Sequence, residues 1–184
     1  MTLFKNKYRI ESARLRGYDY SSPGLYFVTI CTKNRECFFG DVVNGEMDLS
    51  PIGDIVADEW QKTPQVRANV QLDEWVVMPN HLHGAIWITH TIPMANVETF
   101  RRNVSTADTK PRLQPNSLGS MIGQVKSVCT KRIRAAGYTD FDWQERFWDE
   151  IIWNERTLDA VRAYIINNPA NWEKDKDNLA GLRM

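Results

Sequence analysis

The chain has 184 residues, of which 23 are Lys or Arg and 23 are Asp or Glu, so its formal net charge at pH 7 is zero. Hydrophobic residues make up 42% and charged residues 25%, with 10 glycines and 8 prolines, which excludes collagen-like and fully disordered chains. No apolar run approaches the roughly 20 residues of a membrane span, and the N-terminus lacks the apolar region of a secretory signal. We therefore expect one soluble, cytoplasmic domain over residues 1–184.

The cysteines and the distribution of charge indicate which cross-links and which charged surfaces to expect. Cys31, Cys37 and Cys129 show no C-x-x-C spacing, which predicts reduced packing residues rather than a disulfide framework. A neutral chain argues against a protein that depends on a uniformly basic surface. However, residues 36–62 hold seven acids and one base, whereas residues 101–134 hold eight bases and one acid. One part of the fold can therefore carry a local cationic surface.

Apolar patterns with periods of 2 and 3.6 residues predict four strands and three helices in the order β-α-β-β-α-β-α. The strands cover about 25–33, 70–78, 81–89 and 147–153, and the helices about 51–63, 117–136 and 157–167. Ser50 and Pro51 favour the start of the first helix, which we expect Pro64 to end, and Pro79-Asn80 favours a tight turn. The first six elements match the split βαβ arrangement. We therefore predict an α+β, ferredoxin-like antiparallel sheet with an additional C-terminal helix.

Two segments lie outside these patterns. Residues 90–116 are rich in Thr, Asn, Pro and Arg and show neither period, which predicts a long, flexible loop. Residues 170–184 follow the last predicted helix and are expected to form a short C-terminal tail.

Two histidines, His81 and His83, are two positions apart on a predicted strand. Strand alternation puts both imidazoles on one face and Leu82, Ile86 and Ile88 on the other, beneath the helices. Imidazoles about 6–7 Å apart along a strand can share a divalent cation if a third ligand arrives from another element. The spacing also leaves open a half-exposed polar face with no metal.

Tyr164 and Asn168 are four positions apart on the last predicted helix and therefore share one of its faces. By spacing alone, Tyr164 packs its ring beside an apolar stripe and points its hydroxyl to water. Asn168 directly precedes Pro169, which is typical of a residue at the C-terminus of a helix.

Several runs of residues together resemble one known family. They are Met78-Pro79-Asn80-His81-Leu82-His83, Trp143-Gln144-Glu145-Arg146-Phe147-Trp148 and Tyr164-Ile165-Ile166-Asn167-Asn168-Pro169, together with Tyr26-Phe27-Val28-Thr29-Ile30 and an Arg35-x-x-x-Phe39-Gly40 pattern. Their order resembles the single-tyrosine HUH transposases, in particular the REP-associated tyrosine transposase group. The resemblance covers about residues 20–169.

The resemblance implies a ferredoxin-like catalytic domain in which His81 and His83 bind a divalent cation, Asn168 is a third ligand and Tyr164 is the nucleophile. The cation would be Mg²⁺ or Mn²⁺: imidazole suits Mn²⁺ better than the hard Mg²⁺, whereas cellular abundance and the resemblance favour Mg²⁺ as the working ion. The substrate would be single-stranded DNA with a hairpin, cleaved and rejoined through a covalent 5′-phosphotyrosine. The protein would act as a monomer or a homodimer, and no general base is identifiable.

Basic residues are the candidate DNA contacts, and phosphate binding by them should weaken with salt. They are Arg14, Arg16, Arg101, Arg102, Lys126, Lys131, Arg132 and Arg134. Four aromatic side chains either offer stacking surfaces to unpaired bases or belong to the core: Trp143, Phe147, Trp148 and Trp153. The alternative to an enzyme is a non-catalytic module that binds single-stranded nucleic acid on its sheet, although the RNP pattern of RRM domains is missing.

Overall fold

The four long strands form one antiparallel sheet in the computed structural model, which describes residues 15, 17–89, 114–175 and 178. Their order across the sheet is β4 (Val70–Met78), β5 (His81–Ile88), β1 (Gly24–Cys31) and β6 (Trp148–Ile152). All neighbouring pairs run antiparallel. The first and third of these strands along the chain are therefore central in the sheet, as in ferredoxin-like folds, and the predicted α+β fold class is confirmed.

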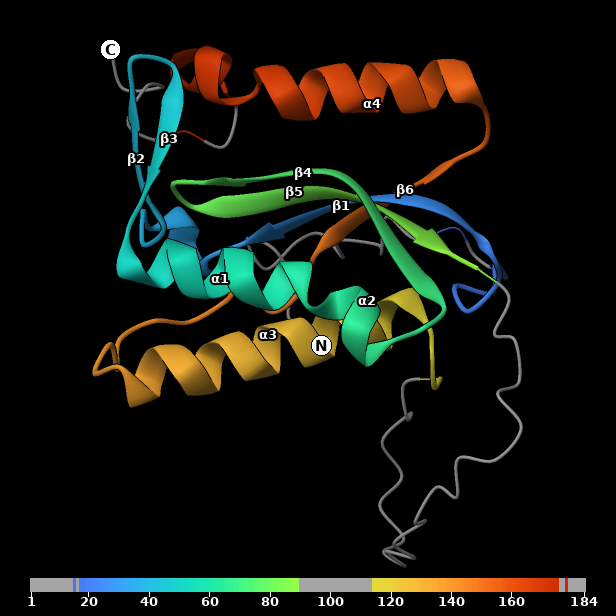
Figure 1. The fold of residues 1–184 in the computed structure, drawn as a ribbon, viewed down its shortest axis with the longest axis horizontal. Coiled ribbons are helices and arrows are strands. Elements are labelled where there is room, and N and C mark those ends of the chain that lie inside the picture. Colours follow the sequence, from blue (N-terminus) through green and yellow to red (C-terminus); the bar gives the residue numbers. More distant parts are fainter. Residues whose placement is uncertain (1–14, 16, 90–113, 176–177, 179–184) are drawn as a thin grey trace, which may run out of the picture.

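Helices cover both faces of the sheet (Figure 1). One face carries α1 (Pro51–Gln61), the short α2 (Thr63–Val66) and α3 (Leu118–Ala135), and the opposite face carries α4 (Glu155–Asn167). The additional C-terminal helix thus forms a third layer. Among the described residues no helix is long and apolar enough to span a bilayer.

Capping side chains set where the long helices begin. Ser50, Ser117 and Asn154 each accept a hydrogen bond from a backbone N–H of the first helical turn. α1 ends at Gln61, two residues before the predicted end at Thr63, and Pro64 belongs to the next helix. Pro64 lies in the first turn of α2, where a proline interrupts no helical hydrogen bond. Most of the predicted loop, residues 90–113, lies outside the described part of the chain.

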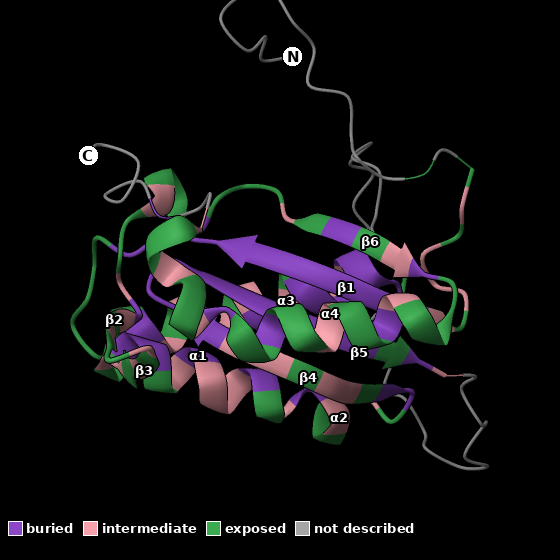
Figure 2. Ribbon diagram, turned by 90° about the horizontal axis from the view of Figure 1, so that it is seen from above, coloured by how far each residue is buried: buried purple, intermediate pink, exposed green. Residues whose placement is uncertain are grey.

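Apolar side chains fill the space on both sides of the sheet. The larger cluster lies between the sheet and α1 and α3, and it contains Leu82, Ile86 and Ile88 as predicted. The smaller cluster joins the sheet to α4 and consists of Leu25, Phe27, Ala85, Ile152, Leu158 and Ile165. Because both faces are covered, β1 is buried along nearly its whole length (Figure 2).

The sequence patterns do not predict a second sheet, the hairpin of β2 (Gly40–Val43) and β3 (Glu46–Leu49). Its turn residues, Asn44 and Gly45, both have positive φ, as a type I′ turn requires. The Asn44-Gly45 pair is therefore the feature of the sequence that indicates this hairpin. β3 contacts η2 (Pro169–Lys174), a 3-10 helix that follows α4, so the hairpin supports the segment where a simple tail was expected.

Gly84 marks a close approach between β5 and α1. A Cβ at this position would lie 2.3 Å from Cζ2 of Trp60, whose ring is fully buried. We expect Gly84→Ala to destabilise the fold by about 1–3 kcal/mol, the usual cost of overpacking a core, measured by urea unfolding. Trp60→Phe removes the clashing atom, so Gly84→Ala should cost less in that background. An equal cost in both backgrounds would contradict this contact.

Candidate active site

β5 presents both histidines to the face that α4 covers. His83 lies opposite Thr29 of β1 and His81 lies opposite Cys31. The two imidazole centroids are 4.3 Å apart, and Trp172 of η2 packs 6.0 Å from the ring of His81. Both histidines are at most 1% exposed. The alternative of a half-exposed polar face is therefore wrong, because the last helical layer covers this part of the sheet.

Hydrogen bonds at Nδ1 orient the two imidazoles. Nδ1 of His81 lies 2.8 Å from Oδ1 of Asn80, whose Nδ2 donates to the backbone oxygen of Arg35. Because Oδ1 can only accept, Nδ1 of His81 donates this hydrogen bond, which leaves Nε2 as the ring nitrogen available to a cation. Nδ1 of His83 lies 2.9 Å from Oγ1 of Thr29, a hydroxyl that can accept in the same way. Such outer contacts are typical of histidines that bind a metal through Nε2.

Tyr164 of α4 lies directly beside this pair. Its hydroxyl oxygen is 3.3 Å from Nε2 of His83, and its ring meets Phe27 edge to face at 6.0 Å. The residue is 41% exposed, so a substrate can reach the hydroxyl while the ring stays held. The fold thus brings together a tyrosine and a histidine that are 81 positions apart in the chain.

Two further side chains with oxygen atoms, Asn168 and Asp175, lie near the histidines. They come from the end of α4 and from the segment that follows it. Asn168 is the C-terminal cap of α4, as its place before Pro169 predicts, and is 3% exposed. Its Nδ2 donates to Oδ2 of Asp175 at 3.1 Å, whereas its Oδ1 is buried and has no hydrogen-bond partner among the described residues. Asp175 follows η2, and together with His81 and His83 it offers ligand atoms that all lie within 4.8 Å of one another.

Asp175 is a candidate ligand that the sequence patterns do not predict. It falls in the segment expected to be a tail, and its approach to the histidines depends on η2 turning the chain back after Pro169. An acidic residue shortly after a helix-ending proline is a weak signal, since exposed acids are common near chain ends.

The donor set fits a divalent cation. Two imidazole nitrogens and a carboxylate oxygen converge, and Asn168, whose Nδ2 donates to that carboxylate, has a buried amide oxygen with no hydrogen-bond partner among the described residues. Imidazole and oxygen ligands together suit Mn²⁺ and related metals, and the oxygens also suit Mg²⁺. A buried acceptor with no donor costs free energy, and a bound cation would remove that cost.

An ion pair holds α4 on the sheet beside this site. Nε and Nη2 of Arg162 donate to the two carboxylate oxygens of Asp73 in β4, at 2.8 and 2.7 Å. These hydrogen bonds lower the pKa of Asp73 to about 2. The register of α4, and with it the position of Tyr164, is therefore fixed by a bidentate contact as well as by apolar packing.

We expect this ion pair to make stability depend on pH. A carboxyl group with a depressed pKa stabilises the folded state above its unfolded pKa, near 3.8, and this stabilisation is lost as the pH falls towards about 2. Asp73→Asn should therefore lower the urea midpoint at pH 7 and have a much smaller effect at pH 2, where the pH has reached the folded-state pKa. Unfolding curves of both proteins across this range test the expectation. A difference that stays constant with pH would contradict it.

A hollow with a volume of about 420 Å³ opens beside Tyr164 and His83. Its other lining residues are Phe27, Thr29, Trp148, Asn167, Asn168, Asn171, Lys174 and Asp175. The volume lies in the range of small-molecule sites, roughly 300–1,000 Å³. The hydroxyl of Tyr164 and the candidate cation site therefore border the same open space.

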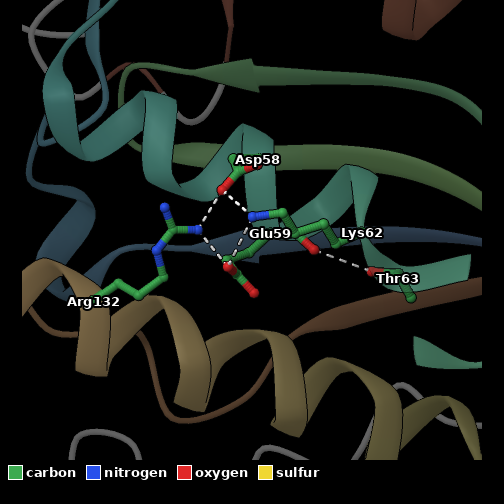
Figure 3. A network of polar contacts seen from close by, with 5 residues as sticks. All are labelled: Asp58, Glu59, Lys62, Thr63 and Arg132. Atoms are coloured by element: carbon green, nitrogen blue, oxygen red, sulfur yellow. Dashed lines mark hydrogen bonds and ion pairs between the residues drawn. The ribbon is translucent and has the colours of Figure 1, made fainter. Parts of the chain in front are cut away.

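The basic residues of α3 lie on the opposite side of the sheet from the histidines (Figure 1). Arg132 donates to the carboxylates of Asp58 and Glu59 in α1, which ties the two helices together (Figure 3). Nζ of Lys126 donates to two backbone oxygens of the segment that precedes β6. The fold does not bring these two cations to Tyr164.

The other predicted DNA contacts are either exposed on α3, as Lys131 and Arg134 are, or outside the described residues, as Arg14, Arg16, Arg101 and Arg102 are. Lys174, which is not among the predicted DNA contacts, lines the hollow beside Tyr164. It is a cation within the candidate site itself.

The four aromatic residues that were expected to be either core or stacking surfaces divide evenly. Trp143 and Phe147 pack in the core on the α3 side of the sheet. Trp148 and Trp153 are 42% and 69% exposed. Of these two, Trp148 lines the hollow.

Comparisons with known proteins agree with this architecture. No protein-family model matches the chain. A solved structure of the REP-associated tyrosine transposase bound to a REP hairpin matches with a TM-score of 0.55 and 20% identity, covering 89% of this chain and 74% of that one. An uncharacterized protein of Haemophilus influenzae is 35% identical over 166 residues, which cover 90% of this chain and 91% of that protein. The chain therefore belongs to the same family as this Haemophilus influenzae protein, and it shares its fold with the REP-associated tyrosine transposase.

Proposed function

We propose that this protein is a transposase-type enzyme that cleaves and rejoins single-stranded DNA, with Tyr164 as its nucleophile. The observation that carries the proposal is the 3.3 Å distance between the hydroxyl of Tyr164 and Nε2 of His83, beside a second buried imidazole. A shared fold with a transposase bound to a REP hairpin supports hairpin DNA as the substrate class.

A divalent cation, Mg²⁺ or Mn²⁺, belongs to the proposal. His81, His83 and Asn168 would hold it, as the family resemblance implies, and Asp175 would add a carboxylate. When bound, the cation reduces the negative charge of a phosphodiester and polarises its phosphorus. Asn80 and Thr29 keep both imidazoles oriented for this role.

Tyr164 would carry out the covalent step. A phenol has a pKa near 10, so its proton must leave before or during attack. The tyrosine oxygen then bonds to phosphorus, and the bond from phosphorus to the 3′-oxygen of the preceding nucleotide breaks. The products are a 5′-phosphotyrosine and a 3′-hydroxyl that takes up a proton. Because one phosphoester replaces another, attack by a 3′-hydroxyl reverses the step and joins strands without ATP.

The test is a search for the covalent adduct. The protein is incubated with a pool of single-stranded hairpin DNAs whose flanking nucleotides are randomised, in Mg²⁺ or Mn²⁺, and the products are separated under denaturing conditions. A label at the 3′ end should move with the protein, whereas a label at the 5′ end should appear in a shorter free strand. Binding without any adduct in either metal would instead favour the non-catalytic module.

A further inference from the structure

An exposed tryptophan shares a row of the sheet with the candidate catalytic residues. Thr29 of β1 pairs with His83 on one side and with Trp148 on the other. Directly paired residues point to the same face, and neighbouring strands are about 4.8 Å apart, which puts the backbone of Trp148 roughly 10 Å from that of His83.

Aromatic contacts hold the indole of Trp148 in place. Phe27 meets it edge to face at 5.6 Å, and the same phenyl ring stacks on His83 at 5.3 Å. Trp148 is nevertheless 42% exposed and lines the hollow at Tyr164. A supported but accessible indole is a surface on which a flat ring can stack.

The opposite wall of the hollow supplies polar groups. Nδ2 of Asn167 donates to the backbone oxygen of Ala163, and Nδ2 of Asn171 donates to the backbone oxygen of Asn167. These bonds fix the two amides while each keeps a second N–H and a carbonyl oxygen, the groups that read the edge of an unpaired base. Lys174 adds a positive charge that suits a phosphate.

We propose that this hollow is a nucleobase site, in which an unpaired base next to the reacting phosphate stacks on Trp148 and is contacted by Asn167 and Asn171. The proposal rests on the proposed function for its choice of DNA as the ligand. It requires neither a covalent step nor a bound metal, so it can be tested separately from both.

The experiment compares a base-containing strand with a base-free strand. Fluorescence anisotropy measures binding of the full chain to a labelled oligothymidylate of about 12 nucleotides and to an abasic strand of equal length. The wild type should bind the oligothymidylate more tightly. Trp148→Ala should weaken that binding about 5- to 100-fold and leave binding of the abasic strand unchanged, and Trp148→Phe should restore most of the loss.

The matched control is Trp153→Ala. Trp153 is also exposed, but it packs against Tyr18 and does not line the hollow; its replacement should change neither affinity. The same losses should appear in a Tyr164→Phe background, even if no adduct is ever observed. The proposal is overturned if the wild type binds both strands equally or binds neither, if Trp148→Ala has no effect, or if Trp153→Ala has the same effect.

Discussion

Tyr164→Phe should abolish the covalent protein–DNA adduct while leaving DNA binding nearly unchanged. Phenylalanine keeps the ring that packs against Phe27 and His83 but lacks the oxygen that would bond to phosphorus. Loss of a nucleophile lowers rates by about 10³-fold or more, so no labelled DNA should migrate with the protein. Denaturing electrophoresis measures the adduct, and anisotropy with the same hairpin measures binding.

Tyr138→Phe is the matched control for this prediction, because Tyr138 and Tyr164 are both 41% exposed. Tyr138 lies after the end of α3 and does not line the hollow. The control should form the adduct at the wild-type level. An adduct that survives in Tyr164→Phe would refute Tyr164 as the nucleophile, and a loss in both variants would indicate general damage to the fold.

Local sequence patterns predict the four strands of the main sheet and the apolar face that packs against α1 and α3. Alternation along β5 predicts that His81 and His83 share a face and that Leu82 packs under the helices, and the core clusters agree. What alternation cannot predict is burial of the histidine face. The continuous apolar run of β1 contained that information, since a strand covered on both faces has no polar side.

The remaining features depend on contacts between distant segments. The apolar stripe of α4 predicts that the helix packs against an apolar surface but does not say which one. Its position on the sheet also depends on the ion pair between Arg162 and Asp73. Asp175 reaches the histidines only because η2 reverses the chain after α4 and rests on the β2–β3 hairpin. No periodicity within one segment encodes such an approach, so the sequence predicted the histidines and tyrosine but not the carboxylate.

His81→Ala should remove metal binding and, with it, adduct formation. The imidazole is fully buried, and because its Nδ1 donates to Asn80, Nε2 is the nitrogen that faces the candidate cation site. Loss of one ligand should weaken Mn²⁺ binding by about 100-fold or more, beyond the 10–100-fold typical of lost outer-shell contacts. Titration calorimetry with Mn²⁺ measures the affinity, and chelation of the metal from the wild type should reproduce the loss of adduct.

A destabilised fold could also abolish metal binding, so each variant is compared with itself. A ligand that binds only the folded state raises its stability, by about 2.7 kcal/mol at a concentration 100 times its Kd. Mn²⁺ should therefore raise the unfolding temperature of the wild type and have no effect on His81→Ala. Asp175→Asn should show a reduced increase, because a neutral amide replaces the carboxylate. Asp142→Asn should respond like the wild type, because the carboxylate of Asp142 pairs with Lys33 and is not among the converging ligands. An undiminished response in His81→Ala would show that the cation binds elsewhere, and an undiminished response in Asp175→Asn would limit the ligands to the two imidazoles and Asn168.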